Sequence, residues 1–273
     1  MSDTCYSCRC MVRLCILVWF ALHLSFATQT LATTITVTNT NDSGPGSLRQ
    51  ALTAANDGDT INFAVTGTIT LNSGGLPINK NITISGPSPD QLSVDGNQAL
   101  LVFGVFPGKA ATISGLTVMN AQSGILNDGT VTVTNCVLSG NSAATCGGVC
   151  GGVEIANTIL NANASGNIDG IVTSHGYNIS SDDGGGLLTG PGDQINTDPL
   201  LGPLRDHGGP TLTHMPMRGS PAIDVGDPSF TPPPDHDQRG ACFLRVFGPR
   251  IDVGSVETQL RPRCVTPAPR PTP

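Results

Sequence analysis

The chain has 273 residues, of which 4% are aromatic and 12% charged, while Gly and Pro number 34 and 21. This low charge excludes a long-helix or coiled-coil protein, because an exposed helix needs Glu, Lys and Arg on its wet face. Intrinsic disorder is excluded as well, since it requires high charge and few β-branched residues, and Val, Ile and Thr are abundant here. The composition is typical of a β-rich protein with many turns.

The net charge of −7 is concentrated in the first part of the chain, where residues 33–188 hold 3 basic and 10 acidic residues. Phosphate binding requires clustered cations. We therefore expect no nucleic-acid partner.

An apolar run at 14–26 follows Arg9 and Arg13. Ser25 and Ala27 place small residues at the −3 and −1 positions of a cleavage site, as in a secretory signal peptide. The run is shorter than the roughly 20 residues that a membrane helix needs. We expect a secreted protein, extracellular or on the outer cell surface, with no membrane span in the mature chain.

Cleavage after Ala32 is an alternative to cleavage after Ala27, and we assign the whole segment 1–32 to the signal peptide. Met11 begins a well-proportioned signal of its own and is an alternative start of the chain. Residues 1–10 carry three cysteines, and under that alternative they form an upstream mis-start in preference to a zinc motif.

Removal of the signal leaves five cysteines, which are Cys136, Cys146, Cys150, Cys242 and Cys264. An exported protein meets an oxidising environment, where disulfides form. Cys146 and Cys150 are separated by Gly-Gly-Val and are predicted to bridge locally, because a metal site would need a nearby His or further Cys. The odd number leaves at least one thiol free or paired between chains.

Residues 46–56 form the only convincing helix of the mature sequence. Ser47 can cap it, and its apolar residues recur with helical spacing. The residues on that apolar face are Leu48, Ala51, Leu52 and Ala55. We expect this helix to cover the open end of a β-structure, where unpaired strands invite aggregation.

The middle of the chain repeats itself. Residues 135–141 and 157–163 align at a spacing of 157 − 135 = 22, while residues 115–120 precede them by 20 and residues 178–180 follow by 21. A strand-rich repeat of this length predicts a β-solenoid, in which each coil buries its apolar face against the next. Roughly seven coils fit in the region before residue 190.

Asn135, Asn157 and Asn178 recur at equivalent places, as the first residue of three of these segments. We hypothesise that their amides form a hydrogen-bonded ladder along one bend of the solenoid. The alternative is that they are ordinary turn asparagines that share a period.

Several motifs carry a family resemblance. Ser-Leu-Arg-Gln-Ala (47–51), Gly-Asp-Thr-Ile (58–61) and Gly-Thr-Ile-Thr-Leu (67–71) resemble the opening of secreted β-helix proteins akin to polymorphic outer-membrane proteins. Six later motifs resemble, in order, the choice-of-anchor Q domain. They are Gly-Tyr-Asn (176–178), Thr-Asp-Pro-Leu-Leu-Gly-Pro-Leu (197–204), Gly-Gly-Pro-Thr-Leu-Thr-His (208–214), Gly-Ser-Pro-Ala-Ile-Asp (219–224), Asp-Gln-Arg-Gly (237–240) and Asp-Val-Gly-Ser-Val-Glu (252–257).

This resemblance implies an all-β, right-handed parallel β-helix with a pectate-lyase-like fold. The helix and its N-terminal cap would occupy 33–190, an irregular C-terminal wrap 191–258 and a Pro-rich tail 259–273. Relatives often carry Cys where this chain has Ile251, which puts the partner of Cys242 in doubt. The tail shows no sorting signal, so attachment to the cell surface in cis is also in doubt.

Asp224 is the last residue of one wrap motif (219–224), and Asp252 is the first residue of another (252–257). Arg239 lies in a third (237–240). We expect Arg239 to pair with Asp224 or Asp252 and to pin the wrap. We predict no metal or other cofactor. Calcium held by Asp oxygens is the alternative, although no Asp-x-Asp-x-Asp-Gly loop and no Gly-Gly-x-Gly-x-Asp repeat occurs.

Parallel β-helices include polysaccharide hydrolases and lyases, so catalysis has to be weighed on residues. The Asp182-Asp183, Asn196-Thr-Asp198 and His207-Gly208 motifs do not follow the order of galacturonan hydrolases. A lyase needs a strong base beside calcium-binding acids, and the solenoid region offers three cations. We expect a monomeric, non-catalytic, structural or adhesion-type protein that contacts surface glycans or proteins of host or neighbouring cells. A β-helix lyase or glycoside hydrolase is the alternative.

Overall fold

The computed structural model describes residues 31–86, 92–98, 101–203, 205–208, 212–232, 235–240 and 242–259. The predicted signal peptide up to residue 30 and the tail from residue 260 lie outside the described residues. Among those described, no helix is both long and apolar enough to span a membrane.

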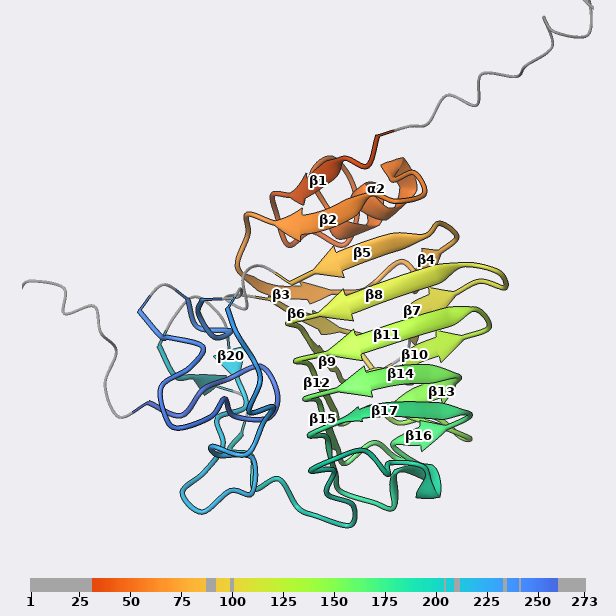
Figure 1. The fold of residues 1–273 in the computed structure, drawn as a ribbon. Helices are drawn as coiled ribbons and strands as arrows, with labels where there is room; N and C mark the ends of the chain where they lie inside the picture. The colour runs from red at the N-terminus through yellow and green to blue at the C-terminus, as the bar shows by residue number, and fades with distance from the viewer. Residues whose placement is uncertain are drawn as a thin grey trace, which may run out of the picture. The chain divides into compact units, whose positions relative to one another are not determined.

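The chain winds in successive coils, and the strands of these coils form three parallel sheets. The result is a right-handed parallel β-helix, which confirms the predicted fold class (Figure 1). Each coil contributes one strand to each sheet in turn, because alternating apolar and Thr, Ser or Asn residues form strands and Gly or Asn residues form the bends. The seven strands of sheet A are β1 (Thr34–Val37), β2 (Thr60–Phe63), β5 (Ile82–Ser85), β8 (Ala110–Ser114), β11 (Thr130–Thr134), β14 (Val153–Ala156) and β17 (Val172–Gly176).

Sheets B and C complete the coils. Sheet B consists of β3 (Gly67–Thr70), β6 (Leu92–Asp95), β9 (Thr117–Met119), β12 (Val137–Ser139), β15 (Ile159–Asn161) and β18 (Ile179–Ser180). Sheet C consists of β4 (Leu76–Ile78), β7 (Leu101–Val105), β10 (Ser123–Asn127), β13 (Val149–Gly151) and β16 (Ile168–Asp169).

The interior is filled by aliphatic side chains that stack from coil to coil. In sheet A, Ile61 pairs with Ile84, Ile84 with Ile113, and Ile113 with Val133, and all four are buried. No single coil could bury this face alone, so the core belongs to the stack as a whole.

Helix α2 (Leu48–Ala54) caps the N-terminal end as predicted and packs against β1 and β4. The Ser47 hydroxyl accepts from Gln50 N at 3.2 Å, and the predicted apolar face is buried. At the other end of the coils, buried Leu188 follows the short 3-10 helix η1 (Gly184–Gly186) and joins the same core.

The wrap was predicted to begin at residue 191, but coil-like pairing continues a little further. Gln194 N donates to Asn178 O at 2.8 Å, and Thr197 N donates to Ser180 O at 3.0 Å. After Thr197, the described residues are irregular apart from two isolated bridges and the antiparallel pair β19 (Arg205–Asp206) and β20 (Leu212–Thr213).

The wrap packs on the outer side of sheet B (Figure 1). Val137 and Ile159 of sheet B form a second buried cluster there with Ala222 and Val253 of the wrap. The middle strands of sheet B, β9 and β12, are therefore buried on both faces.

Candidate functional site

The bend between sheets A and B contains two of the three predicted ladder residues. Asn157 Nδ2 donates to Asn135 Oδ1 at 2.8 Å, one coil away. Both residues have left-handed backbone, with φ of 52° at Asn135 and 48° at Asn157, which Asn tolerates better than most residues. The amide ladder is present between these two residues, and the same asparagines also shape the bend.

The prediction is wrong for Asn178, because strand β17 contains a bulge. Ile155 pairs with Ser174 while Ala156 pairs with Gly176, so His175 is an extra residue. The bulge moves Tyr177 into the bend position, with φ of 57°. Asn178 is buried one position later and donates from Nδ2 to Asp193 Oδ1 at 3.0 Å.

A longer ladder, which the sequence analysis missed, lies in the bend after sheet B. Asn141 Nδ2 donates to Asn163 Oδ1 at 2.9 Å, and Asn163 Nδ2 donates to Asn167 Oδ1 at 2.8 Å. Asn167 Nδ2 in turn donates to Asp182 Oδ1 at 3.0 Å. The three asparagines are buried, so the ladder is structural. The 22-residue spacing of Asn141 and Asn163 was the signal that could have revealed it.

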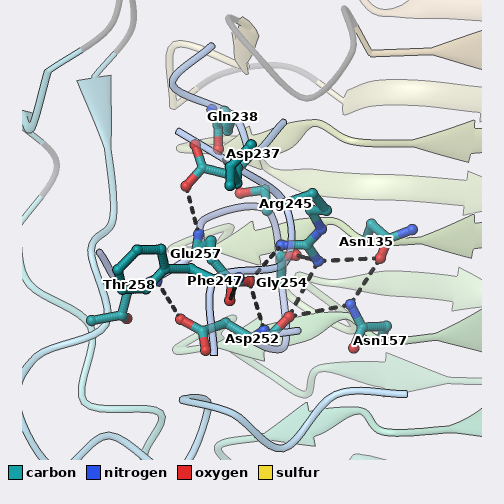
Figure 2. Close-up of polar contacts among 12 residues, drawn as sticks. Asn135, Asn157, Asp237, Gln238, Arg245, Phe247, Asp252, Gly254, Glu257 and Thr258 are labelled. Atoms are coloured by element: carbon teal, nitrogen blue, oxygen red, sulfur yellow. Dashed lines mark hydrogen bonds and ion pairs between the residues drawn. The ribbon is translucent and has the colours of Figure 1, made fainter. Parts of the chain in front are cut away.

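Arg245, which the sequence analysis did not single out, joins the wrap to the coils (Figure 2). Its guanidinium is fully buried and donates from Nη2 to Gly254 O at 2.7 Å and to Asn135 Oδ1 at 3.3 Å. Gly254 N donates to Asn157 O at 3.0 Å. Asn135 and Asn157, in the bend between sheets A and B (the first bend), are thus the attachment point of the wrap.

Two buried carboxyl groups, Asp252 and Glu257, lie beside Arg245, and Arg245 Nη1 is 3.7 Å from Glu257 Oε2. Burial, followed by the neighbouring Asp252, raises the pKa of Glu257 to about 8 despite the opposing effect of Arg245. Burial also raises the pKa of Asp252. The three side chains are almost completely buried, and their contacts join residues 245–257 of the wrap to one another.

Carboxylate oxygens of Asp224, Asp252 and Glu257 lie within 4.8 Å of one another, a spacing that would suit a cation. However, the four oxygens of Asp252 and Glu257 already accept from backbone N–H groups of Asp224, Thr258, Phe247 and Asp252. Arg245 supplies positive charge at the same place. These contacts favour an ionic cluster over the calcium alternative.

The predicted pairing of Arg239 with Asp224 or Asp252 is wrong. Arg239 Nη2 instead lies 2.6 Å from Asp237 Oδ2, and both side chains are buried. Asp237 is two residues away, so a local turn brings the pair together and no long-range contact is needed. Arg239 also stacks on Phe243, with its guanidinium carbon 4.0 Å from the ring centre.

The cysteines fall into two groups. Cys146 and Cys150 form the predicted disulfide. Cys242 is also disulfide-bonded, so Ile251 does not leave it as a thiol. Among the described cysteines, Cys136 is the free thiol; it faces the interior, where burial raises its pKa to about 12.

An open groove of about 210 Å³ lies next to the attachment point, between the first bend and the wrap. Half-buried Tyr177 of the coils and half-buried Phe230 of the wrap both line it, as does His175, whose side chain is 53% exposed. Asp227 is the one carboxyl group that lines it. Arg250 lies over the Tyr177 ring at 5.1 Å and fixes its orientation.

None of the three motifs weighed for catalysis contributes a residue to the lining of this groove. Asp182 ends the buried ladder, and Asp237 pairs with Arg239. His207 Nε2 accepts from Arg205 Nε at 3.0 Å, and His214 Nδ1 lies 2.8 Å from Gly202 O.

A comparison with protein-family models finds no match, and neither does a comparison with curated proteins.

Proposed function

We propose that this protein is an exported, non-catalytic β-helix with an adhesion-type role, which holds a neutral glycan weakly in the groove between Tyr177 and Phe230. The observation that carries the proposal is the composition of that groove. Two aromatic rings flank the amides of Asn135 and Asn157, and one carboxyl group, Asp227, is available to accept from sugar hydroxyls. Apolar rings with a few polar groups are typical of small-molecule sites.

The size of the groove supports weak binding. Its volume of about 210 Å³ is below the roughly 300–1,000 Å³ of most ligand pockets, so it suits one or two sugar units of a longer chain. Arg250 lies over the Tyr177 ring, and Gly192 lies close to Cδ1 and Cε1 of the same ring, so a sugar would contact only the part of the ring that lines the groove. Adhesion would then arise from many copies binding together.

Two features argue against hydrolysis or elimination. Glycoside hydrolysis uses a pair of carboxyl groups roughly 5–9.5 Å apart, and the groove has one. The three cations of the coils are engaged elsewhere. Arg49 pairs with Asp42, Lys80 donates to Ala55 O, and Lys109 pairs with Asp57.

The proposal is tested by titrating the purified full chain with neutral and uronate oligosaccharides, with and without calcium. We expect a Kd on the order of 1 mM and no new reducing ends or unsaturated products. Tyr177→Asn keeps a residue that the same bend accepts at Asn135 and Asn157, and we expect it to weaken binding roughly three- to tenfold.

Phe247→Ala removes an exposed ring of the wrap that does not line the groove, and serves as the matched control. Product formation would favour the lyase or hydrolase alternative and overturn the proposal. Equal binding by the wild-type and Tyr177→Asn proteins would show that the groove is not the site.

A further inference from the structure

The outer face of sheet A carries two ranks of short hydroxyl-bearing side chains. Because the strands pair in parallel, residues of the same kind lie next to each other from coil to coil. The first rank runs through Thr34, Thr60, Thr83, Thr112 and Thr132. The second rank contains Thr36 beside Asn62, and Ser85 beside Ser114 and Thr134.

The hydroxyl groups of both ranks are available to an outside ligand. Within the described part of the chain, none of these threonines and serines uses its side chain in a hydrogen bond to protein, whereas Thr117 and Thr158 elsewhere do. The ranks are exposed or half-exposed, and the wrap packs on sheet B (Figure 1).

The geometry of the ranks is regular. Neighbouring strands are about 4.7–4.9 Å apart, and two residues along a strand span about 6.6 Å, which together define a two-dimensional lattice. Threonine is stiff at χ1, so its methyl and hydroxyl groups are held in place before any ligand arrives. Such preorganisation lowers the entropic cost of binding.

The hollows on this face lie at its β11–β17 end, one lined by Glu154 and Thr173 and the other by Thr134. Along the ranks, each hydroxyl or methyl group offers only a weak contact. Appreciable affinity therefore requires many contacts at once, which only a ligand with its own repeating lattice can provide. The first five strands of the sheet have no charged side chain in either rank, and Glu154 in β14 is the first. An uncharged face of this kind matches a neutral solid surface.

We propose that the outer face of sheet A binds ice. Methyl groups restrict the orientation of adjacent water, and hydroxyl groups hydrogen-bond to it, so the ranks would arrange water in a lattice that can join a growing crystal. Crystalline polysaccharide is the competing neutral solid. Stacking on its sugar rings would require aromatic side chains, and the two ranks of described residues consist of Thr, Ser and Asn.

This activity is independent of the proposed glycan groove. The test measures the concentration of purified full chain needed to inhibit ice recrystallisation, and its incorporation into a slowly growing ice hemisphere. Thr112→Lys and Thr83→Lys each place a long charged side chain in the first rank, and we expect the effective concentration to rise at least about tenfold. Circular dichroism and the Tm verify that each variant retains the fold.

Leu126→Lys introduces the same side chain at an exposed position of sheet C and should leave ice binding unchanged. Thr112→Val keeps the methyl group and replaces the hydroxyl with a second methyl, and we expect a smaller loss than for Thr112→Lys. Tyr177→Asn should leave ice binding unchanged whatever its effect on glycans.

Exclusion of the wild-type chain from ice, or full activity of folded Thr112→Lys and Thr83→Lys, would overturn the proposal. So would retention on crystalline cellulose or chitin that depends on Thr112, in the absence of ice binding.

Discussion

The coils and the wrap are stabilised in different ways, although each has a buried interior. In the coils, Ile84 lies between Ile61 and Ile113, and backbone pairing is repeated from strand to strand. In the wrap, pairing is sparse, and the buried side chains include Arg239 and Arg245. Repetition spreads stability over many similar contacts, whereas an irregular segment must satisfy its backbone with a few polar side chains.

The largest effect is expected in the wrap, whose stability depends on a few buried polar side chains. Arg245→Met would leave Glu257 and Asp252 without their positive neighbour and would leave Gly254 O without its donor. Breaking a buried pair in this way costs about 3–5 kcal/mol. We expect proteolysis and hydrogen exchange to increase in the wrap while the coils stay protected.

Arg218→Met, at an exposed position of the wrap, is the control and should change neither measurement. Simultaneous loss of protection in wrap and coils would show that the two regions unfold as one unit, and the distinction between them would fail.

The next effect concerns the coils. Asn163→Ala removes the middle of the buried ladder. It leaves Asn141 N without its acceptor Asn163 Oδ1, and Asn141 Nδ2 and Asn167 Oδ1 each lose one of their two partners. Each unsatisfied buried group costs about 1–3 kcal/mol. We expect the midpoint of denaturant unfolding to fall, and exposed Asn79→Ala to leave it unchanged; equal midpoints for the two variants would contradict a structural role for the ladder.

The third prediction is a pH dependence confined to the wrap. The pKa of Glu257 rises on folding from its ordinary value of 4.5 to about 8. The folded state therefore binds a proton more tightly, so this contribution to stability is present below pH 4.5 and is lost as the pH rises towards 8. The protection factors of residues 242–259, in which the base-catalysed rise of intrinsic amide exchange is divided out, should fall over that range.

Glu257→Gln cannot ionise, and we expect it to flatten this dependence. A slope that persists in Glu257→Gln would assign the titration to another group, with Asp252 the first candidate because burial raises its pKa as well.

The smallest effect concerns reactivity alone. The buried Cys136 thiol has a pKa of about 12, so almost no thiolate exists at neutral pH. We expect the peptide that contains Cys136 to resist iodoacetamide in the native protein and to react fully after unfolding, as followed by mass spectrometry. Rapid labelling of the native protein would mean that the coils open readily around this residue.

The sequence predicts the coils well because their signal is local and repeated. The 22-residue spacing identifies the solenoid and the Asn135–Asn157 pair, and the helical spacing of apolar residues after Ser47 identifies the cap. The position of Asn178 was misjudged because a single bulged residue, His175, shifts the register of everything after it in that coil. Spacing along the chain carries no mark of such a bulge.

The contacts of the wrap depend on distant residues. Arg245 lies 110 positions from Asn135, yet the two side chains are hydrogen-bonded. Motif order indicates that a wrap exists, but it does not indicate which arginine is buried or which aspartate it approaches. Arg239 was assigned to Asp224 or Asp252 on this incomplete basis, whereas the fold pairs it with Asp237.

By itself, the sequence determined that this protein is a stack of similar coils with a capping helix, because periodic apolar residues can be buried only by stacking. The alternation of apolar and polar residues also determined which side chains of each strand point outward. The tertiary structure alone decided which face stays open, which carboxyl groups share a buried arginine, and where aromatic rings from two regions meet in a groove. Those outcomes depend on how an irregular segment folds back over the coils, and contacts between residues far apart in sequence leave no periodic signal.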